Sequence, residues 1–532
     1  MYKKVSLLII LLAGLFCACA QTNLTGIVFN DQNRNNHFDL GEEALPNISV
    51  SSLSTIVQSN RQGIFQIPVE QQDIVFVIKP NDFEFPLQAN RVPSFYHIVY
   101  QKPSPEELVY EGIQATQHIS DTLYFPMYKS MIKNQYSAQL IGDIQAPTKK
   151  EVEFFQETIV PLLYQHPADF KICLGDIADN DLSVYPLIEG ALWGINTPLY
   201  MVLGNHDINY RAKDITTEAE TFRKHFGPDY YSFNYGTTHF VVLNTVQYAG
   251  WDSTENKHGS YHGGLQTKQL NWLKQDLTLV EKDQQIVLLA HIPLLIEHSD
   301  SSSIQQVFDL LKNQEKILAI YGHLHLAGSW QHTPLFRWNS KGKFDGQIAG
   351  AACGAWWVGP YGLDSIPDAT CVDGCPPGIY LYNFYGQDYS KEFIAASNSR
   401  YKHLRISFPP SSLPIDSIKN NFIYVNVFDG NDNTQVQISI DDAAFHDMKK
   451  VIEIDPYLKR NNYLRFNREK WKPGLVPSSH LWKVEFPTGL LPGKHVIKAS
   501  CQLQNGKKYI TTKVFEISPL PELEPDTNST AK

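Results

Sequence analysis

The chain has 532 residues, of which 43% are hydrophobic, 12% aromatic and 19% charged, a composition that is typical of globular domains and excludes a disordered or fibrous protein. Its 45 Lys and Arg against 55 Asp and Glu give a net charge of −10, so the overall charge does not favour general binding of nucleic acid. Seven cysteines are too few for a disulfide-built scaffold, and the length fits three or four domains.

The N-terminus, residues 1–20, has the features of an export signal. Lys3 and Lys4 precede the apolar run VSLLIILLAGLFCA, which is shorter than the roughly 20 residues of a membrane-spanning helix. Cys19 after Ala18 resembles the acceptor cysteine of a bacterial lipoprotein, whereas the same segment also fits an ordinary cleavage site. We therefore expect an exported protein, either periplasmic or tethered to the outer membrane through a lipid on Cys19; an uncleaved anchor is the remaining alternative.

Residues 22–92 predict a small β-sandwich module, because short apolar runs alternate with Gly, Asn, Asp and Pro. Its loop 31–42 has oxygen-bearing side chains at the spacing of a calcium-binding loop, with Asn36 where such loops usually have Gly. Calcium binding is one interpretation of this loop, and an ordinary Asn-rich turn is the other. A connecting segment, 93–130, is expected to follow. The oxygen-bearing residues of the loop are Asp31, Asn33, Asn35, Asp39 and Glu42.

Residues 131–345 alternate apolar strands with helical stretches, which predicts a layered α/β core. The segments AQLIGD, FKICLGD, PLYMVLGNHD, QIVLLAHIPL and KILAIYGHLHL are typical of buried strands, and TKQLNWLKQDL of an amphipathic helix. Residues 346–520 predict a β-rich C-terminal domain: a Gly-, Trp- and Tyr-rich stretch precedes regularly spaced short strands. The acidic, Pro-rich tail 521–532 is expected to be disordered.

Five short motifs of Asp, Asn and His occur along the core, four of them at the ends of predicted strands. Ligands of open α/β sheets gather beyond the carboxyl ends of strands, so we expect these motifs to meet in one crevice. Carboxylate, amide oxygen and imidazole suit Mn, Fe and Zn, and two such cations need a shared anionic ligand, which a carboxylate supplies. The motifs are Gly142-Asp143-Ile144-Gln145, Gly175-Asp176-Ile177-Ala178-Asp179, Gly204-Asn205-His206-Asp207, Ala290-His291 and Gly322-His323-Leu324-His325.

The order of these motifs resembles that of the calcineurin-like metallophosphoesterases, D-x-H, G-D-x-x-D, G-N-H-D/E, H and G-H-x-H, over roughly residues 137–330. Each motif alone is weak, and all five in sequence are a strong signal. The resemblance implies a four-layer α-β-β-α core, here flanked by β-modules as in a bacterial exported subgroup. It also implies hydrolysis of a phosphate mono- or diester by a hydroxide that bridges two divalent metal ions.

The resemblance further assigns roles to individual residues. His206 would face the substrate phosphate and help to protonate the leaving oxygen, and Asp207 would hold the ring of His206 and raise its basicity. Asp176 would bridge both metals. The remaining ligands implied are Asp143 and His325 at the first metal, and Asn205, His291 and His323 at the second.

One position departs from the family pattern: Gln145 stands where the His of D-x-H is usual. An amide oxygen is a weaker ligand than imidazole for late transition metals, so the change bears on metal identity and first-site occupancy. Gln145 could coordinate the metal or hydrogen-bond a bound water. It also motivates the alternative that the fold is degenerate and holds a phosphate-bearing ligand without turnover; a glycan-binding surface protein is a third hypothesis.

Several other residues have two interpretations. Trp356 and Trp357 could form a substrate platform or pack between domains. Asp179 is interpreted as a helix cap or loop contact more readily than as a functional group. Weaker candidates for a functional role are His262, Asp364 and Asp373, and Cys371 and Cys375 are close enough in sequence to bridge across a turn.

Overall fold

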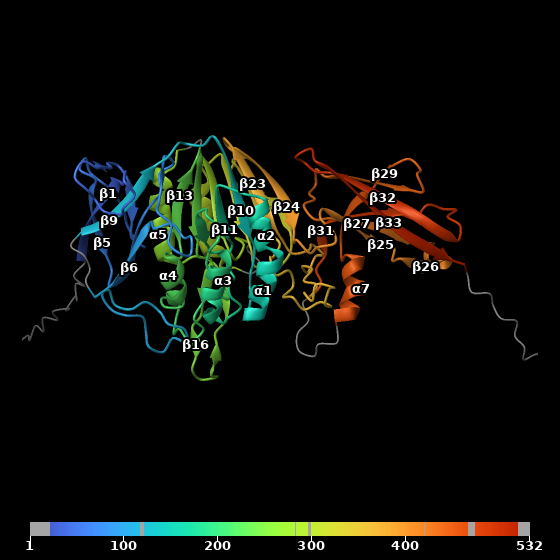
Figure 1. The fold of residues 1–532 in the computed structure, drawn as a ribbon, viewed down its shortest axis with the longest axis horizontal. Helices are drawn as coiled ribbons and strands as arrows, with labels where there is room; N and C mark the ends of the chain where they lie inside the picture. Colours follow the sequence, from blue (N-terminus) through green and yellow to red (C-terminus); the bar gives the residue numbers. More distant parts are fainter. Residues whose placement is uncertain are drawn as a thin grey trace, which may run out of the picture.

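The computed structural model describes residues 22–117, 122–281, 284–295, 299–419, 421–465 and 474–519. The expected export signal with Cys19 and the expected tail lie outside these residues. The chain forms three parts that follow one another along the long axis of the molecule: an N-terminal β-module, a central core and a C-terminal domain (Figure 1). Among the described residues, no helix has both the length and the apolar character needed to cross a membrane.

The N-terminal module consists of two sheets that share one hydrophobic core with the centre of the molecule. Its contact with the core includes a hydrogen bond from the indole N–H of Trp272 to Ser51 Oγ (2.9 Å). The first sheet contains β1 (Thr22–Asn30), β2 (Glu43–Ala44), β5 (Ile64–Val69), β7 (Phe83–Glu84) and β9 (Thr122–Lys129). The second contains β3 (Ser49–Ser51), β4 (Ile56–Gln58), β6 (Gln72–Val77) and β8 (Tyr96–Tyr100).

The segment 93–130, expected to be a connection, contributes strands to this module. β8 pairs antiparallel with β6, and β9 pairs parallel with β1, where Ile27 lies opposite Tyr124. The module therefore extends to the end of β9. A parallel partner almost a hundred positions away leaves no local pattern in the sequence, and this explains the difference from the expected boundary.

The core is built on two central sheets that stack face to face through aromatic side chains. The ring centroids of Phe170 and Phe240, from opposite sheets, lie 5.4 Å apart, and those of Tyr200 and Phe233 lie 3.8 Å apart. The order of the first sheet is β12 (Leu199–Met201), β11 (Phe170–Cys173), β10 (Gln135–Ile141), β23 (Gly378–Tyr385), β24 (Asp388–Ala395). The order of the second is β13 (Tyr231–Tyr235), β14 (Thr238–Leu243), β19 (Gln285–Ala290), β20 (Lys316–Tyr321), β22 (Lys343–Ile348), β21 (Gly328–Gln331).

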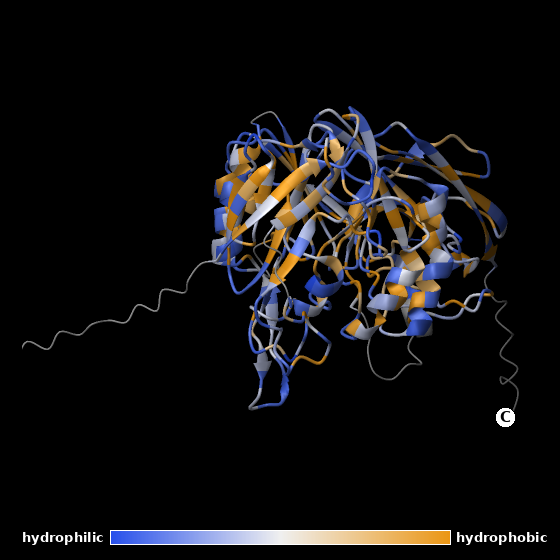
Figure 2. Cartoon of the chain, turned by 60° about the vertical axis from the view of Figure 1, so that its left-hand side comes forward, coloured by the Kyte–Doolittle hydropathy of each residue, from blue (hydrophilic) through white to orange (hydrophobic). Residues whose placement is uncertain are grey.

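Helices connect the parallel strands of each sheet and cover its outer face, which gives four layers, α-β-β-α, and confirms the predicted fold class (Figure 1). Apolar residues concentrate on the strands between the helical layers (Figure 2). Two helices begin at side-chain caps, Thr148 and Asp300. The helices of the core are α1 (Lys149–Thr158), α2 (Val160–Gln165), α3 (Tyr185–Leu192), α4 (Glu220–Phe226), α5 (Thr267–Asp276) and α6 (Ser301–Leu311). Two small hairpins complete it, β15 (Val246–Tyr248) with β18 (Tyr261–Gly263) and β16 (Trp251–Asp252) with β17 (Lys257–His258).

The core also extends beyond the boundary expected near residue 345. β23 pairs antiparallel with β10, and β24 pairs with β23, so both belong to the first central sheet. The C-terminal domain begins after them and has a hydrophobic cluster of its own. One of its sheets contains β25 (Leu404–Phe408), β27 (Phe422–Val427), β30 (Lys449–Glu453) and β31 (Ser478–Glu485). The other contains β26 (Ser412–Pro414), β28 (Gln435–Ile440), β29 (His446–Asp447), β32 (Gly493–Gln502) and β33 (Lys508–Ser518), and α7 (Pro456–Arg465) lies beside them.

Candidate metal centre

The predicted ligands follow the carboxyl ends of five strands drawn from both central sheets. These ends lie at one edge of the stacked sheets, as is usual for ligand sites in α/β folds. All of the ligands are buried except His323, which is partly exposed. Asp143 follows β10, Asp176 follows β11, Asn205 follows β12, His291 follows β19, and His323 and His325 follow β20.

Asp176, His291 and His323 form the tightest part of the cluster. Each offers one ligand atom, and these atoms all lie within 4.8 Å of one another. His291 Nε2 lies 3.0 Å from Asp176 Oδ2 and 3.1 Å from Asn205 Oδ1. One carboxylate, one amide oxygen and two imidazoles thus converge, which is a donor set suited to a divalent transition metal.

Asp143 and His325 lie beside this group. Asp143 Oδ1 is 3.9 Å from His291 Nε2 and 3.7 Å from His325 Nε2. The backbone N–H of His323 donates to Asp143 Oδ1 (3.0 Å), which fixes the carboxylate relative to the loop after β20. The structure therefore brings together side chains separated by almost two hundred positions in the chain.

Two histidines present the same nitrogen to the carboxylates. His291 Nδ1 lies 2.8 Å from the carbonyl oxygen of Leu174, and His325 Nδ1 lies 2.5 Å from that of Gly354. A carbonyl oxygen only accepts, so we assign the ring proton to Nδ1 in both cases. Nε2 of both rings then faces carboxylate oxygens, and either a second ring proton or a cation bound between these atoms makes that arrangement favourable.

Gln145, which stands where the family usually has a histidine, has a buried side chain. Its Nε2 contacts Asp179 Oδ1 (3.4 Å), whereas its Oε1 has no hydrogen-bond partner among the described residues. A buried amide oxygen without a partner is costly unless something else binds it. The residues present therefore fit a metal ion, with Gln145 Oε1 as an available ligand atom.

Opposing charges set the pKa values in this cluster. Burial disfavours the charged form of Asp176, yet His291 and His206 hold the pKa of its carboxyl below its ordinary value. Burial also opposes the charge on His291, but Asp176 raises its pKa to about 9. Burial, followed by the repulsion of His291, lowers the pKa of His323 to about 3. Burial raises the pKa of Asp143. The carboxylates thus attract positive charge that the protein supplies only in part.

The backbone around the cluster is tight and strained. A Cβ on Gly204 would lie 2.0 Å from the backbone nitrogen of Asp176, so only glycine allows these two loops to meet. Asp176, His323 and His325 have positive φ angles of 48°, 75° and 50°, which are uncommon for residues other than glycine. Such strain concentrates at functional sites, where the surrounding structure maintains it.

His206 lies at the open side of the cluster, with 24% of its side chain exposed. Its backbone N–H donates to Asp176 Oδ1 (2.8 Å). Its Nδ1 lies 3.1 Å from Asp179 Oδ1 and 2.5 Å from Asn180 Oδ1. Both oxygens are acceptors, so we assign the ring proton to Nδ1. Asp179 and Asn180, in the loop after β11, thus fix the orientation of the ring.

The expected role of Asp207 therefore needs correction. Its carboxylate accepts hydrogen bonds from the backbone N–H groups of Ile177 and Gly204 (both 3.0 Å) and from the hydroxyl of Tyr185 (3.0 Å), so it ties two loops together. Burial, followed by repulsion from Asp176, raises the pKa of Asp207 to about 7. The role that the family resemblance implied for Asp207 is therefore filled by Asp179 and Asn180, which contact Nδ1 of His206. Asn180 was missed; its position after the G-D-x-x-D motif, within one turn of Asp176, is the only signal.

The paired tryptophans have separate environments. The ring of Trp356 stacks on the imidazole of His325, with centroids 3.9 Å apart and planes 16° apart. Trp357 is buried and packs against Phe154, with centroids 5.6 Å apart. The first Trp thus borders the metal centre, and the second belongs to a small cluster of core residues.

The other weak candidates, Asp373 and Asp364, contact residues outside the cluster. Asp373 is buried, accepts from the backbone of Ala327 (2.7 Å) and lies 2.8 Å from His480, which ties the C-terminal domain to the loop after β20. Asp364 accepts from Asn398, and His262 is exposed on β18. Cys371 and Cys375 are buried, and no disulfide joins them.

The loop 31–42 folds its side chains onto its own backbone. Asp31 accepts from the backbone of Asn35 and Asn36, and Glu42 accepts from the backbone of Asp39 (3.0 Å). These contacts satisfy the loop as a turn, so calcium binding stays a prediction.

Comparisons with known families match most of the chain in three consecutive stretches. The family "Calcineurin-like phosphoesterase" matches residues 140–327. The family "N terminal of Calcineurin-like phosphoesterase" matches residues 32–112, and "C terminal of Calcineurin-like phosphoesterase" matches residues 347–509. The stretch 140–327 contains every residue of the cluster described above except the supporting Gly354 and Trp356.

Individual relatives match a smaller part. Serine/threonine-protein phosphatase CPPED1 of Homo sapiens is 33% identical over 124 residues, 23% of this chain and 36% of that protein. The protein of the same name from Mus musculus is 34% identical over the same length and the same shares. The match thus spans about a third of the length of these relatives. Among solved structures, purple acid phosphatase PPD1 from yellow lupin seeds has a TM-score of 0.36 and 10% identity, covering 72% of this chain and 74% of its own.

Proposed function

Because this chain belongs to the calcineurin-like phosphoesterase family, we propose that it is a hydrolase that cleaves a phosphate ester in a metal-dependent reaction. The observation that carries the proposal is the convergence of Asp176, His291 and His323, whose ligand atoms lie within 4.8 Å of one another. The curated relatives bear the name of a phosphatase, which is consistent with this class of reaction.

We propose two divalent ions, with Mn, Fe or Zn as the candidates, held by the residues of the cluster. Asp176 is the shared ligand, because a carboxylate can offset the repulsion between two cations. Bound metal ions of this kind lower the pKa of water and so generate a nucleophile at neutral pH. The proposed ligands are Asp143, Gln145 and His325 for one ion and Asn205, His291 and His323 for the other.

His206 is the proposed proton donor to the leaving oxygen. Its ring lies at the open side of the cluster, and Asp179 and Asn180 hold Nδ1. With the proton of Nδ1 engaged, Nε2 is the atom that exchanges a proton with substrate. Positive charge on this ring also stabilises the negative charge that develops on the phosphoryl oxygens.

We further propose that the protein is exported and belongs to a bacterial subgroup with β-modules on both sides of the core, tethered by a lipid on Cys19 or released into the periplasm. The sequence of the first 20 residues supports this proposal. Metabolic labelling with a fatty-acid analogue tests the tether: incorporation into the natural chain and none into Cys19→Ser is the expected result. Equal labelling of both chains contradicts it.

The reaction is tested by metal analysis of the purified full chain, followed by hydrolysis of paired aryl phosphate mono- and diesters. We expect transition metal to copurify, turnover of at least one ester, and loss of that turnover after chelation with recovery on adding Mn, Fe or Zn. The ratio of the two rates assigns the protein to monoesters or diesters. Full turnover after complete metal removal contradicts the proposal, and metal binding without turnover favours the degenerate alternative that Gln145 suggests.

A further inference from the structure

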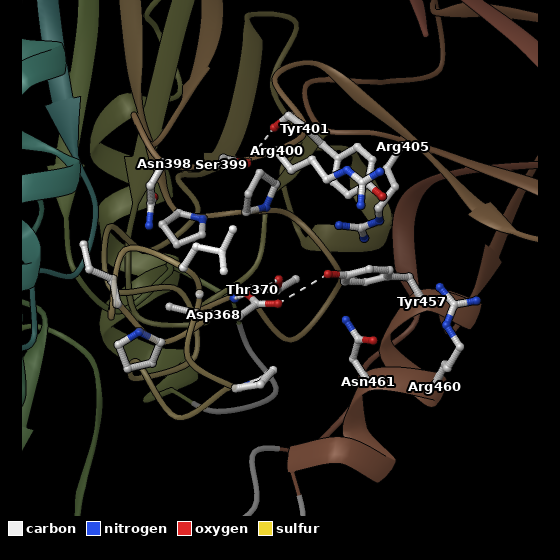
Figure 3. A pocket seen from close by; sticks show the side chains of 18 of the residues that line it. Asp368, Thr370, Asn398, Ser399, Arg400, Tyr401, Arg405, Tyr457, Arg460 and Asn461 are labelled. Carbon is white, nitrogen blue, oxygen red and sulfur yellow. Dashed lines mark hydrogen bonds between the residues drawn. The ribbon is translucent and has the colours of Figure 1, made fainter. Parts of the chain in front are cut away.

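A large pocket separates the core from the C-terminal domain, with a cavity volume of about 1550 Å³. Figure 3 shows one side of the pocket built from two loops, one with Asp368 and Thr370 and the other with Asn398, and the facing side built from Arg405 and from Tyr457 of α7. Ligand pockets of proteins usually measure about 300–1,000 Å³, so this one has room for more than a single ion.

The pocket contains more positive charge than negative charge. Four cationic side chains line it, and of these Arg405 is already engaged, since it donates to Asp455 (2.8 Å) and its guanidinium lies 3.7 Å from the centre of the Tyr457 ring. Within the described parts of the chain, Arg400, Arg460 and Lys513 have no carboxylate partner; Arg400 and Arg460 lie near the rings of Tyr401 and Tyr457.

Lys513 is held at the pocket wall by backbone carbonyl groups. Its Nζ donates to the carbonyl oxygens of Ile406 (3.3 Å) and Pro409 (2.5 Å), which hold the ammonium at the pocket wall. Burial lowers the pKa of Lys513 to about 8, and repulsion from Arg460, Arg400 and Arg405 adds to the effect. An anion in the pocket would relieve this repulsion.

The two acidic residues of the lining are committed to neighbours. Asp364 accepts from Asn398 Nδ2 (2.9 Å), and Asp368 accepts from the hydroxyls of Thr370 (2.7 Å) and Tyr457 (3.3 Å). They therefore stabilise the walls of the pocket, and the three cations without carboxylate partners determine which ligand charge it favours.

The rest of the lining is mixed, with polar side chains beside prolines and aliphatic side chains, and this bears on the body of the ligand. Seven Ser, Thr and Asn side chains are part of the lining, so a ligand with many hydroxyl groups would find donors and acceptors there. Arginine binds phosphate and sulfate oxygens through paired hydrogen bonds. The Ser, Thr and Asn residues of the lining are Thr370, Asn398, Ser399, Ser411, Asn461, Thr511 and Thr512.

We propose that this pocket is a second binding site, for a small polyhydroxy compound that carries several phosphate or sulfate ester groups. Arg400, Arg460 and Lys513 contact the ester oxygens, and the hydroxyl and amide side chains contact the sugar or polyol body. None of the proposed metal ligands lines the pocket; Trp357 does, whereas the neighbouring Trp356 stacks on His325. The proposal does not depend on the hydrolase activity.

Isothermal titration of the full chain tests the proposal, with inositol hexakisphosphate as the phosphate probe, sucrose octasulfate as the sulfate probe and sucrose as the neutral control. We expect at least one ester probe to bind and sucrose not to bind. The double variant Arg400→Gln/Arg460→Gln should weaken that binding about tenfold or more, the loss expected for two charge-assisted hydrogen bonds. Both residues are exposed, so the variant should fold.

The control variant Arg61→Gln/Lys494→Gln removes two exposed cations elsewhere and should leave the affinity unchanged. Comparing the two ester probes shows whether the pocket selects phosphate or sulfate. The proposal is overturned if neither probe binds, if sucrose binds as tightly as the esters, or if the pocket variant retains full affinity. Binding that Asp176→Asn abolishes while the pocket variant preserves it would assign the ligand to the metal centre and also overturn the proposal.

Discussion

The two sides of the metal centre differ in how closely their ligands are assembled. On the side of His291, ligand atoms from three strand ends lie within 4.8 Å of one another. On the side of Asp143, the nearest imidazole nitrogen, that of His325, is 3.7 Å away, and an amide, Gln145, stands where the family usually has a histidine. In the proposed two-metal arrangement, the fold would therefore fully specify one site, whereas the other would depend on a weaker ligand and is where we expect metal affinity to vary.

Asp176 is the residue that both sides share, so its loss should have the largest effect. We expect Asp176→Asn to lower turnover about 10³-fold or more and to reduce the bound metal, since the shared negative charge is removed. Asp432→Asn, a change at an exposed carboxylate of the C-terminal domain, is the matched control and should keep full activity. Comparable turnover in Asp176→Asn and Asp432→Asn would contradict the proposal that Asp176 is a shared metal ligand.

His206 is not a proposed metal ligand on either side. Its substitution should therefore affect proton transfer without affecting metal binding. We expect His206→Ala to lower turnover about 10²- to 10⁴-fold, as for the loss of a general acid, with metal content unchanged. Asn180→Ala should lower turnover less, because Asp179 still contacts Nδ1. Rates and metal content are measured on the same preparations, and loss of metal in His206→Ala would contradict this assignment.

Gln145 tests the looser side directly. We expect Gln145→His to tighten metal binding about tenfold at one of two sites, because imidazole is the better ligand for late transition metals. The reverse exchange on the tighter side, His291→Gln, should weaken binding there. Competition with a chelating dye measures both. Equal metal affinity in Gln145→His and the natural chain would show that residue 145 does not contact a metal.

Trp356 should have the smallest effect of the four, since it acts on the looser side only through its stack on His325. We expect Trp356→Leu to lower turnover about two- to tenfold by loosening that ring, an effect of roughly 0.5–1.5 kcal/mol. Trp357→Leu is the matched change away from the centre and should affect thermal stability instead, because its ring is buried against Phe154. The opposite pattern would reverse the two roles.

The sequence predicts the α/β core and the position of the ligands well, because each ligand follows an apolar strand within a few residues. It predicts the outer strands poorly: β9 pairs with β1 and β23 with β10 across long stretches of chain, and no local periodicity records such pairing. The sequence also fails to predict which residues contact the ring of His206, for a related reason. Which neighbour reaches its ring depends on the turn at Asn180, where φ is 69°, and not on adjacency along the chain.

The central claim is that two metal ions share Asp176. Anomalous diffraction from crystals of the metal-loaded full chain tests it most directly. The account predicts two peaks about 3.5–4 Å apart, one on each side of the Asp176 carboxylate. A single peak, or two peaks of which neither lies beside Asp176, would contradict it.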